Sequence, residues 1–173
     1  MKIGIISDTH DNLANCRKAC DAFADEGVKV VLHAGDLIAP FVAPIFHKSK
    51  LKLIAVFGNN DGEKLFMREK FAELGFELHH GPHEFELHGH RICLMHEPRC
   101  LDSLVKSGNY DLIIYGHTHE LVTHEEGTPA CRNILRRAGT LVINPGEACG
   151  YLSGKATCAV VNLEDISGRV IEL

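Results

Sequence analysis

The chain contains several apolar segments. In five of them, apolar and polar residues do not strictly alternate. These runs are rich in isoleucine, valine and leucine. Continuous runs of this kind are typical of β-strands that are buried on both faces of a sheet. We therefore expect strands at residues 2–7, 29–34, 52–57, 91–95 and 111–115.

Segments in which apolar residues recur at a helical period lie between the first four of these predicted strands. In the clearest one, Leu13, Cys16, Cys20 and Phe23 recur at a helical period. This segment closes at Gly27, and Asn12 is a candidate N-cap. Shorter helices are expected at residues 41–47 and 63–74. The alternation of strands and helices predicts an α/β fold.

The second half of the chain has a different pattern of apolar and polar residues, in which predicted strands outnumber helices. Residues 84–87 and 91–95 flank a turn at His88 and Gly89, which predicts a β-hairpin. A short helix is expected near residues 101–106. Further strands are expected at residues 140–144, 156–163 and 169–173, separated by turns that contain glycine and serine. The pattern alone therefore predicts an α/β protein with a mixed sheet.

Each of the five apolar runs is followed by residues of the types that bind metal ions. These motifs are Asp8-Thr9-His10, Gly35-Asp36, Gly58-Asn59-Asn60-Asp61, His96, and Gly116-His117-Thr118-His119. In open α/β sheets, groups at the carboxyl ends of neighbouring strands converge on one crevice. Residues that are far apart in the sequence are therefore expected to share one site.

The candidate ligands form a nitrogen and oxygen set without a thiolate. They are Asp8, His10, Asp36, Asn59, His96, His117 and His119. Such a set suits Mn²⁺, Fe²⁺, Ni²⁺, Co²⁺ or Zn²⁺, among which we favour Mn²⁺ or Ni²⁺. Seven ligands are too many for one tetrahedral ion but fit two ions that share a carboxylate. Two such ions, about 3.5–4 Å apart, can clamp a phosphoryl group and acidify the water between them.

These five motifs, in this order, resemble those of the calcineurin-like metallophosphoesterases, in particular the small single-domain prokaryotic phosphodiesterases. The resemblance extends from residue 1 to about residue 146. It implies a four-layer α/β/β/α sandwich with two mixed β-sheets. It also implies a phosphodiesterase that uses a metal-bridging hydroxide for in-line attack on phosphorus. The substrate would be a small phosphate ester, with a nucleotide-type diester among the candidates.

The same resemblance implies a role for each ligand. Asp8, His10, Asp36 and His119 would hold one divalent ion, and Asp36, Asn59, His96 and His117 would hold the other. Asp36 would thus bridge the two ions. The residues expected to take part in catalysis are Asp36, Asn59, Asn60 and His96.

Two departures from the family pattern change the expected chemistry. Asn60 stands where many members carry a histidine that is thought to protonate the leaving group, and an amide cannot donate a proton in that way. Substrates with aryl or otherwise good leaving groups should therefore be favoured. His96 is followed by Glu97 and Pro98, and Glu147 follows Gly146 where serine is common. We expect a reshaped substrate rim that includes Glu97, Arg99 and Glu147.

Two alternative functions remain open. A phosphomonoesterase would differ only in the charge of its substrate and in rim contacts. A metal-binding protein-interaction scaffold would resemble the retromer subunit that looks like these enzymes but acts mainly through binding. Loss of ligands would be the mark of such a scaffold, whereas Asp36 and Asn59 are both present here.

Length and composition limit the class of protein and the compartment that are expected. The 173 residues suit a single domain, residues 1–173, with 45% hydrophobic and 24% charged residues. A net charge of -5 without a run of lysine or arginine argues against an extended nucleic-acid surface. No run approaches about 18 apolar residues, so no membrane span is expected. Seven cysteines without a C-x-x-C pair are expected to be buried thiols in a reduced, cytoplasmic protein.

Several residues have more than one interpretation. His79, His80, His83, His88 and His90 form a histidine-rich tract around the predicted hairpin, and we expect them at the surface. His33 fits core packing and the orientation of a ligand equally well. Asp61 is expected to orient its loop. Residues 41–46 are apolar and are a candidate interface for a homo-oligomer.

Overall fold

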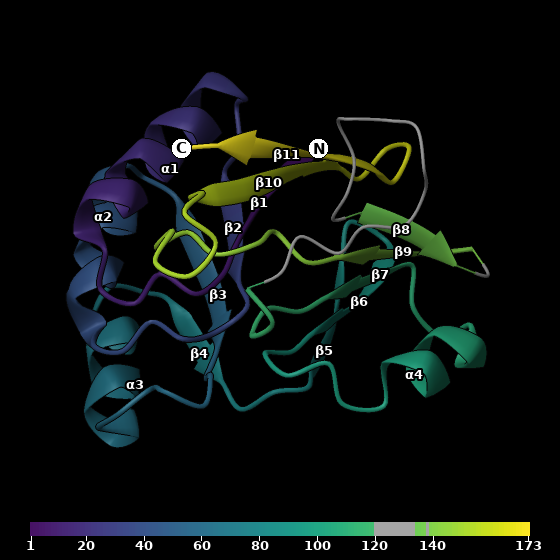
Figure 1. The fold of residues 1–173 in the computed structure, drawn as a ribbon, viewed down its shortest axis with the longest axis horizontal. Helices are drawn as coiled ribbons and strands as arrows, with labels where there is room; N and C mark the ends of the chain where they lie inside the picture. Colours follow the sequence, from purple (N-terminus) through teal and green to yellow (C-terminus); the bar gives the residue numbers. More distant parts are fainter. Residues whose placement is uncertain (120–133, 138) are drawn as a thin grey trace.

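The computed structural model describes residues 1–119, 134–137 and 139–173, which form two β-sheets (Figure 1). The first sheet has the strand order β11-β10-β1-β2-β3-β4, and the second has the order β5-β6-β7-β9-β8. The strands of the first sheet are β1 (Lys2–Ile6), β2 (Val30–His33), β3 (Lys52–Val56), β4 (Glu77–His79), β10 (Thr157–Asn162) and β11 (Ser167–Glu172). Those of the second are β5 (His83–Leu87), β6 (His90–Leu94), β7 (Leu112–Ile114), β8 (Ile134–Arg137) and β9 (Thr140–Ile143).

Both sheets are mixed, as predicted. Strands β1 to β4 run parallel, and β10 joins the free edge of β1 in the antiparallel direction. In the second sheet β6, β7 and β9 are parallel, while β5 and β8 are antiparallel to their neighbours. The five strands predicted from apolar runs are all present, with ends that differ by at most one residue. Strands β4 and β8 were not predicted.

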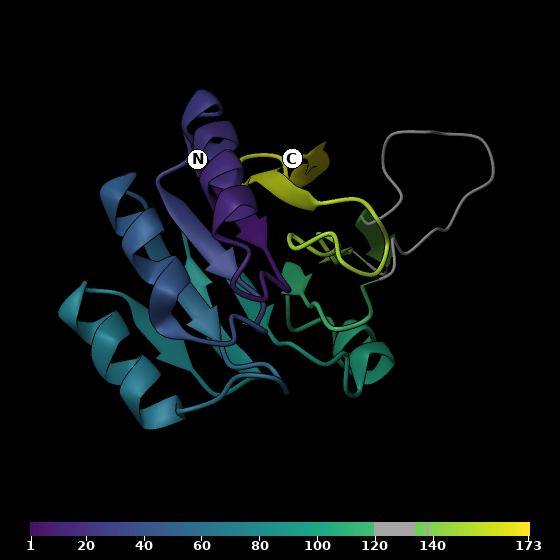
Figure 2. The ribbon, with the colours of Figure 1, turned by 60° about the vertical axis from the view of Figure 1, so that its left-hand side comes forward.

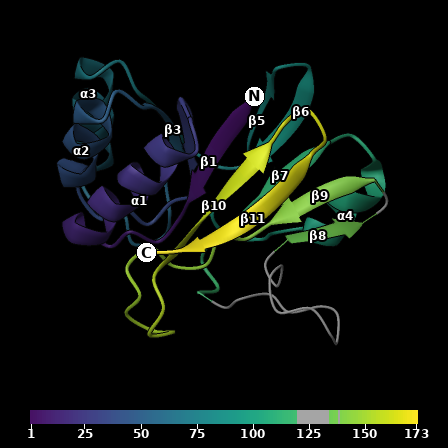
Figure 3. The same cartoon turned by 90° about the horizontal axis from the view of Figure 1, so that it is seen from above.

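Four helices cover the outer faces of the two sheets within the described residues. Helices α1 (Leu13–Asp25), α2 (Ala43–Lys48) and α3 (Lys64–Glu73) lie together on one side, and α4 (Leu101–Ser107) lies on the opposite side (Figures 2 and 3). Phe23, Phe46 and Phe71 belong to the buried cluster under the first three helices. Val105 and Tyr115 belong to the cluster under α4. The predicted four-layer sandwich is therefore confirmed.

The central core lies between the two sheets. Alternate residues of the strands of both sheets point into it, because successive side chains of a strand face opposite ways. The fully buried members include Ile3, Ile5, Leu32, Val56, Ile92, Leu94, Leu112 and Ile114. Burial of both faces explains why these strands are continuous apolar runs in the sequence.

The start of α1 and its buried cysteines agree with the sequence analysis. The side chain of Asn12 caps the helix by accepting a hydrogen bond from the backbone N–H of Asn15 at 3.1 Å. Cys16 and Cys20 lie on the buried face of this helix as free thiols. Burial raises the pKa of Cys16 to about 12, so this thiol stays protonated and unreactive. Among the described helices, none is both long and apolar enough to cross a bilayer.

Residues 41–46 do not form a continuous exposed apolar patch, so the basis for the candidate interface at this segment was wrong. A 3-10 turn, η1 (Pro40–Val42), leads directly into α2. This turn exposes 62% of Phe41 but fully buries Val42, Ala43 and Phe46 in the core under the helices. The apolar stretch therefore exposes Phe41 and Pro44 as separate residues and does not form a continuous apolar patch.

Candidate metal centre

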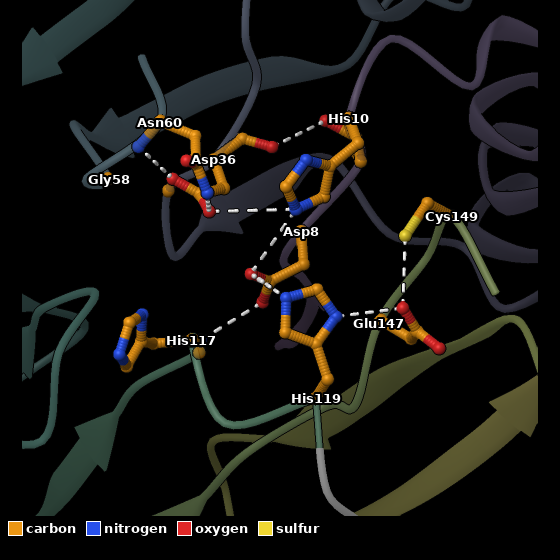
Figure 4. A network of polar contacts seen from close by, with 12 residues as sticks. Asp8, His10, Asp36, Gly58, Asn60, His117, His119, Glu147 and Cys149 are labelled. Atoms are coloured by element: carbon orange, nitrogen blue, oxygen red, sulfur yellow. Dashed lines mark hydrogen bonds and ion pairs between the residues drawn. The ribbon is translucent and has the colours of Figure 1, made fainter. Parts of the chain in front are cut away.

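Loops from both sheets meet at one end of the sandwich. Asp8 and His10 follow β1, and Asp36 follows β2. His119 comes from the loop after β7, in the other sheet (Figure 4). One ligand atom from each of these four side chains lies within 4.8 Å of all the others. The structure therefore brings together the four residues predicted to hold the first ion.

Within this first group, charged and lone-pair atoms face one another. The Nε2 atom of His119 lies 3.4 Å from Oδ1 of Asp8, and Nε2 of His10 lies 3.5 Å from Oδ2 of Asp36. Oδ1 of Asp8 and Nε2 of His10 are buried without a hydrogen-bond partner. Leaving such atoms unpaired is costly, and a cation between them would satisfy both. The donor set thus fits a bound metal ion.

A second group of side chains adjoins the first. The amide oxygen Oδ1 of Asn59 lies 2.9 Å from Nε2 of His96 and 2.9 Å from Nδ1 of His117. Oδ1 of Asp36 lies 3.4 Å from Nε2 of His96. The two carboxylate oxygens of Asp36 therefore face different groups, one toward His10 and one toward His96. This placement is compatible with a carboxylate that is shared by the two groups of side chains.

The tautomer of His96 also favours a cation. Its Nδ1 lies 2.7 Å from the backbone carbonyl of Ala34, which can only accept, so Nδ1 carries the proton. Nε2 faces two further acceptors, Oδ1 of Asn59 and Oδ1 of Asp36, so without a cation this atom is favoured to carry a second proton. Burial lowers the pKa of His96, but the Asp36 and Asp8 carboxylates outweigh burial and raise it. A bound cation would replace the proton that otherwise separates these acceptors.

Hydrogen bonds hold Asp36 in its charged form. Burial raises the pKa of this carboxyl group, but hydrogen bonds from His96 and from Asn60 outweigh it and keep the pKa well below the ordinary value. The backbone N–H of Asn60 donates to Oδ1 at 2.9 Å, and its side-chain amide donates to Oδ2 at 2.7 Å. Asn60 was expected to take part in catalysis. In the structure it also orients Asp36, which the sequence did not indicate.

Glycines allow the carboxylates to sit close to the backbone. A Cβ atom on Gly58 would overlap the Asp36 carboxylate, and one on Gly116 would overlap the Ser7 hydroxyl and approach Asp8. Any larger residue would displace these side chains. The glycines of the Gly-Asn and Gly-His motifs are thus required by the packing of the carboxylates.

The backbone around the centre is strained. Asp8, His10, Asp36, His117 and His119 all have positive φ angles, between 40° and 70°. Such conformations cost free energy in residues other than glycine, and they cluster at functional sites. The hydrogen bond from the backbone N–H of Asp8 to the carbonyl of Gly35, 3.0 Å long, is among those that hold this geometry.

Glu147 is not a rim residue, so this prediction was wrong. Only 1% of it is exposed, because the loop after β9 folds back and the backbone N–H of Ala148 donates to the carbonyl of Ser7. Oε2 of Glu147 accepts hydrogen bonds from Nδ1 of His119 at 2.7 Å and from the Cys149 thiol at 3.1 Å (Figure 4). Nδ1 of His119 therefore carries the proton, and Nε2 is left to face Asp8.

The pKa of Glu147 is also shifted. Burial raises it, but hydrogen bonds from Ser153, His119 and Cys149 outweigh burial and lower it to about 2. Its other oxygen, Oε1, accepts from the backbone N–H of Leu152 at 2.9 Å. With its pKa lowered to about 2, Glu147 stays charged throughout the neutral range. It thus adds a negative charge behind His119.

Replacement of Glu147 by glutamine tests this positioning role. The amide NH₂ of glutamine would meet either the N–H groups of Leu152 and Ser153 or the N–H of His119, and both are donors. We expect metal affinity to fall by about 10- to 100-fold, measured by competition with a chelator. Glu73→Gln, on the exposed face of α3, is the matched control and should leave metal affinity unchanged. Equal affinity in Glu147→Gln and wild type would contradict the role.

Two further predicted residues orient the loops. The Asp61 carboxylate accepts hydrogen bonds from the backbone N–H groups of Ile38 and Gly58, both at 2.7 Å. It therefore orients its loop, as expected. His33 is fully buried, contacts the Thr9 hydroxyl through Nε2 at 3.1 Å, and accepts from the N–H of Gly35 through Nδ1. It links the loops after β1 and β2, which favours orientation over simple core packing.

A cleft of about 320 Å³ opens beside the second group of side chains. Its lining includes Asn59 and His96, an aromatic wall at Phe57, and the charged residues Lys64, Glu97 and Arg99. Nε of Arg99 lies 2.6 Å from Oε2 of Glu97. The sequence analysis had placed Glu97 and Arg99 at the rim, and the structure places both there. It adds Lys64 and Phe57, which the ligand motifs could not indicate.

Comparison with known proteins agrees with this geometry. The family model of the calcineurin-like phosphoesterase superfamily domain matches residues 1–166. A phosphodiesterase from Methanocaldococcus jannaschii is 40% identical over 190 residues, which cover 100% of this chain and 99% of that protein. The solved structure of an archaeal phosphodiesterase, 40% identical and covering 100% of both chains, has a TM-score of 0.87.

More distant structures share the fold alone. Vacuolar protein sorting 29 from Cryptosporidium parvum is 18% identical, with a TM-score of 0.67 and coverage of 99% of this chain and 96% of that chain. A phosphoesterase from E. coli is 21% identical, with a TM-score of 0.63 and coverage of 100% and 98%. The same sandwich therefore occurs in proteins of different names, and the fold by itself does not separate the candidate functions.

Proposed function

The chain belongs to the calcineurin-like phosphoesterase superfamily, and on this basis we propose that it is a dinuclear metal-dependent phosphodiesterase. Its phosphodiesterase relative, 40% identical across the full chain, supports hydrolysis of phosphoric esters. The observation that carries the dinuclear proposal is Asp36. One of its carboxylate oxygens faces His10 at 3.5 Å, and the other faces His96 at 3.4 Å.

We assign the ligands accordingly. Asp8, His10, Asp36 and His119 would hold one divalent ion, and Asp36, Asn59, His96 and His117 would hold the other. The nitrogen and oxygen donors suit transition-metal ions, with Mn²⁺ and Ni²⁺ favoured over Fe²⁺, Co²⁺ and Zn²⁺. Two bound ions would lower the pKa of a shared water, so that hydroxide is available for in-line attack, and would neutralise the phosphoryl oxygens.

The residues of the chain have separate tasks in this proposal. Asn60 holds Asp36 through two hydrogen bonds and presents its amide at the mouth of the site. Lys64 and Arg99 line the cleft and attract an anionic ester. Phe57 gives the same cleft an apolar wall for the organic group. No carboxylic acid among the described cleft residues is free to protonate a poor leaving group, since Glu97 is paired with Arg99.

The substrate would be a small-molecule phosphate diester, including those of the nucleotide type. We propose that the whole of residues 1–173 acts as one phosphoesterase domain. The free, buried thiols of Cys93 and Cys158 support a reduced, cytoplasmic setting.

The experiment that tests the proposal compares two chromogenic substrates on metal-stripped protein. Initial rates of hydrolysis of bis-p-nitrophenyl phosphate and p-nitrophenyl phosphate are measured after addition of Mn²⁺, Ni²⁺, Zn²⁺ or Mg²⁺ in turn. We expect a rate that one or more transition metals restore and that favours the diester. A preference for the monoester would make the protein a phosphomonoesterase. Metal uptake without turnover of either substrate would indicate the protein-interaction scaffold.

A further inference from the structure

A second cluster of metal-binding side chains lies where the edges of the two sheets meet. Strand β4 is an outer strand of the first sheet, and β5 is an outer strand of the second. Glu77 and His79 are two residues apart on β4, so they share one face, while Leu78 between them is buried in the core. His83 is the first residue of β5. The cluster is distinct from the centre around Asp36.

The three donors are already close together. One ligand atom from each of Glu77, His79 and His83 lies within 4.8 Å of the other two. Oε2 of Glu77 lies 3.3 Å from Nε2 of His79. Two ligands of one tetrahedral ion, each about 2.1 Å from it, are about 3.4 Å apart. The glutamate and the first histidine therefore have the separation that one shared ion needs.

The two histidine rings are held side by side. The centroids of His79 and His83 are 3.7 Å apart with an interplanar angle of 11°, and the ring of Phe85 stacks on His83 at 5.0 Å. This arrangement is not that of freely solvated surface histidines. Both side chains are only partly buried, so the rings have room to rotate until their lone pairs converge.

The environment of the glutamate is also suitable. Oε1 of Glu77 is bound by Nζ of Lys52 at 3.1 Å, which orients the carboxylate and leaves Oε2 facing His79. Two imidazoles and a carboxylate form a set that binds Zn²⁺ and similar ions, with one position open to water. By contrast, His88 and His90 lie at the far end of the β5–β6 hairpin, where His90 pairs with Leu87.

We propose that Glu77, His79 and His83 form a separate binding site for Zn²⁺ or a similar transition-metal ion, which joins the edges of the two sheets. An ion held by both strands would tie β4 of the first sheet to β5 of the second. It would stabilise the folded state, because the three donors are held together there. The site does not depend on the proposed phosphodiesterase activity.

The test counts bound metal in the whole protein. Protein loaded with Mn²⁺ is brought to equilibrium by dialysis against Zn²⁺, and total metal per chain is measured by mass spectrometry. The double variant His79→Gln, His83→Gln is expected to bind one ion fewer than the wild type. The matched control His88→Asn, His90→Gln should bind as much as the wild type. Equal metal content in wild type and in the His79, His83 variant would overturn the proposal.

Two further measurements test the site formed by Glu77, His79 and His83 directly. Glu77→Gln keeps both histidines and is expected to weaken binding of Zn²⁺ at this site by about tenfold or more. Imidazole ¹⁵N resonances of His79 and His83, assigned from the variants, should shift on addition of Zn²⁺, and unshifted resonances would refute the site. A failed dinuclear centre would lower the metal content of all variants equally, so the two proposals can fail separately.

Discussion

Asp36→Asn is expected to lower kcat/KM for bis-p-nitrophenyl phosphate by about 10³-fold or more, while the protein remains folded. Asp36 is 1% exposed, and its two oxygens face the two groups of metal-binding side chains. Asparagine has nearly the same shape but carries no charge and only one acceptor oxygen. It could therefore serve one ion but could not bridge two.

The metal content of this variant distinguishes a catalytic effect from a structural one. We expect Asp36→Asn to lose at least one of the ions bound at the centre and to keep the wild-type circular dichroism spectrum. Because hydrogen bonds from His96 and Asn60 lower the pKa of Asp36, loss of this charge is expected to lower the unfolding temperature of the metal-free protein, so both proteins are compared at a temperature at which they are folded. Asp21→Asn, on the exposed face of α1, is the control. A variant with full activity would exclude Asp36 as a bridging ligand.

Much of the fold could be predicted because burial and chain direction leave a clear pattern. Strands with two buried faces are continuous apolar runs, and β1, β2, β3, β6 and β7 were predicted for this reason. Strand β4 was missed because its three residues include Glu77 and His79, which face away from the core. A short edge strand of this kind has the composition of a loop. Strand β4 forms because it pairs with β3, and this pairing cannot be recognised in the sequence.

Residues 41–46 show a different limit of prediction from the sequence. Hydrophobicity alone indicates that a segment will be buried. It does not indicate whether the core of the same chain or a second molecule buries it. The 3-10 turn at Pro40–Val42 directs Val42 and Phe46 into the cluster under the helices, where α1 and α2 pack together. Phe41 and Pro44 are left at the surface. The sequence predicted the helix correctly and its environment wrongly.

The sequence predicted which side chains would lie together at the candidate site, but not the contacts that support them. The ligands lie directly after strands, so the ends of the strands bring them together. Glu147, by contrast, is far from the ligands in the sequence and reaches His119 only because its loop folds back on Ser7 and Asp8. Neither spacing nor periodicity encodes such a contact. The amide of Asn60 bound to Asp36 is a similar case.

The absence of a histidine at position 60 predicts a steep dependence of rate on the leaving group. With diesters whose leaving groups have rising pKa values, we expect the wild-type rate to fall steadily, because the leaving oxygen departs without a proton. The Asn60→His variant is expected to gain about 10²-fold on poor alkyl leaving groups and little on p-nitrophenyl esters. The exposed position of Asn60, next to Asp36, leaves space for an imidazole at the mouth of the site.

Asn60→Ala separates proton donation from the loss of the amide. Alanine also removes the 2.7 Å hydrogen bond to Oδ2 of Asp36 but supplies no acid. It should lower the rate by a similar factor for every ester and leave the slope unchanged, whereas histidine should flatten the slope. A wild-type rate that does not depend on the pKa of the leaving group would show that a proton donor is already present. In that case the donor must be sought among the other groups of the cleft, with Lys64 first because it lines the same cleft as Asn59.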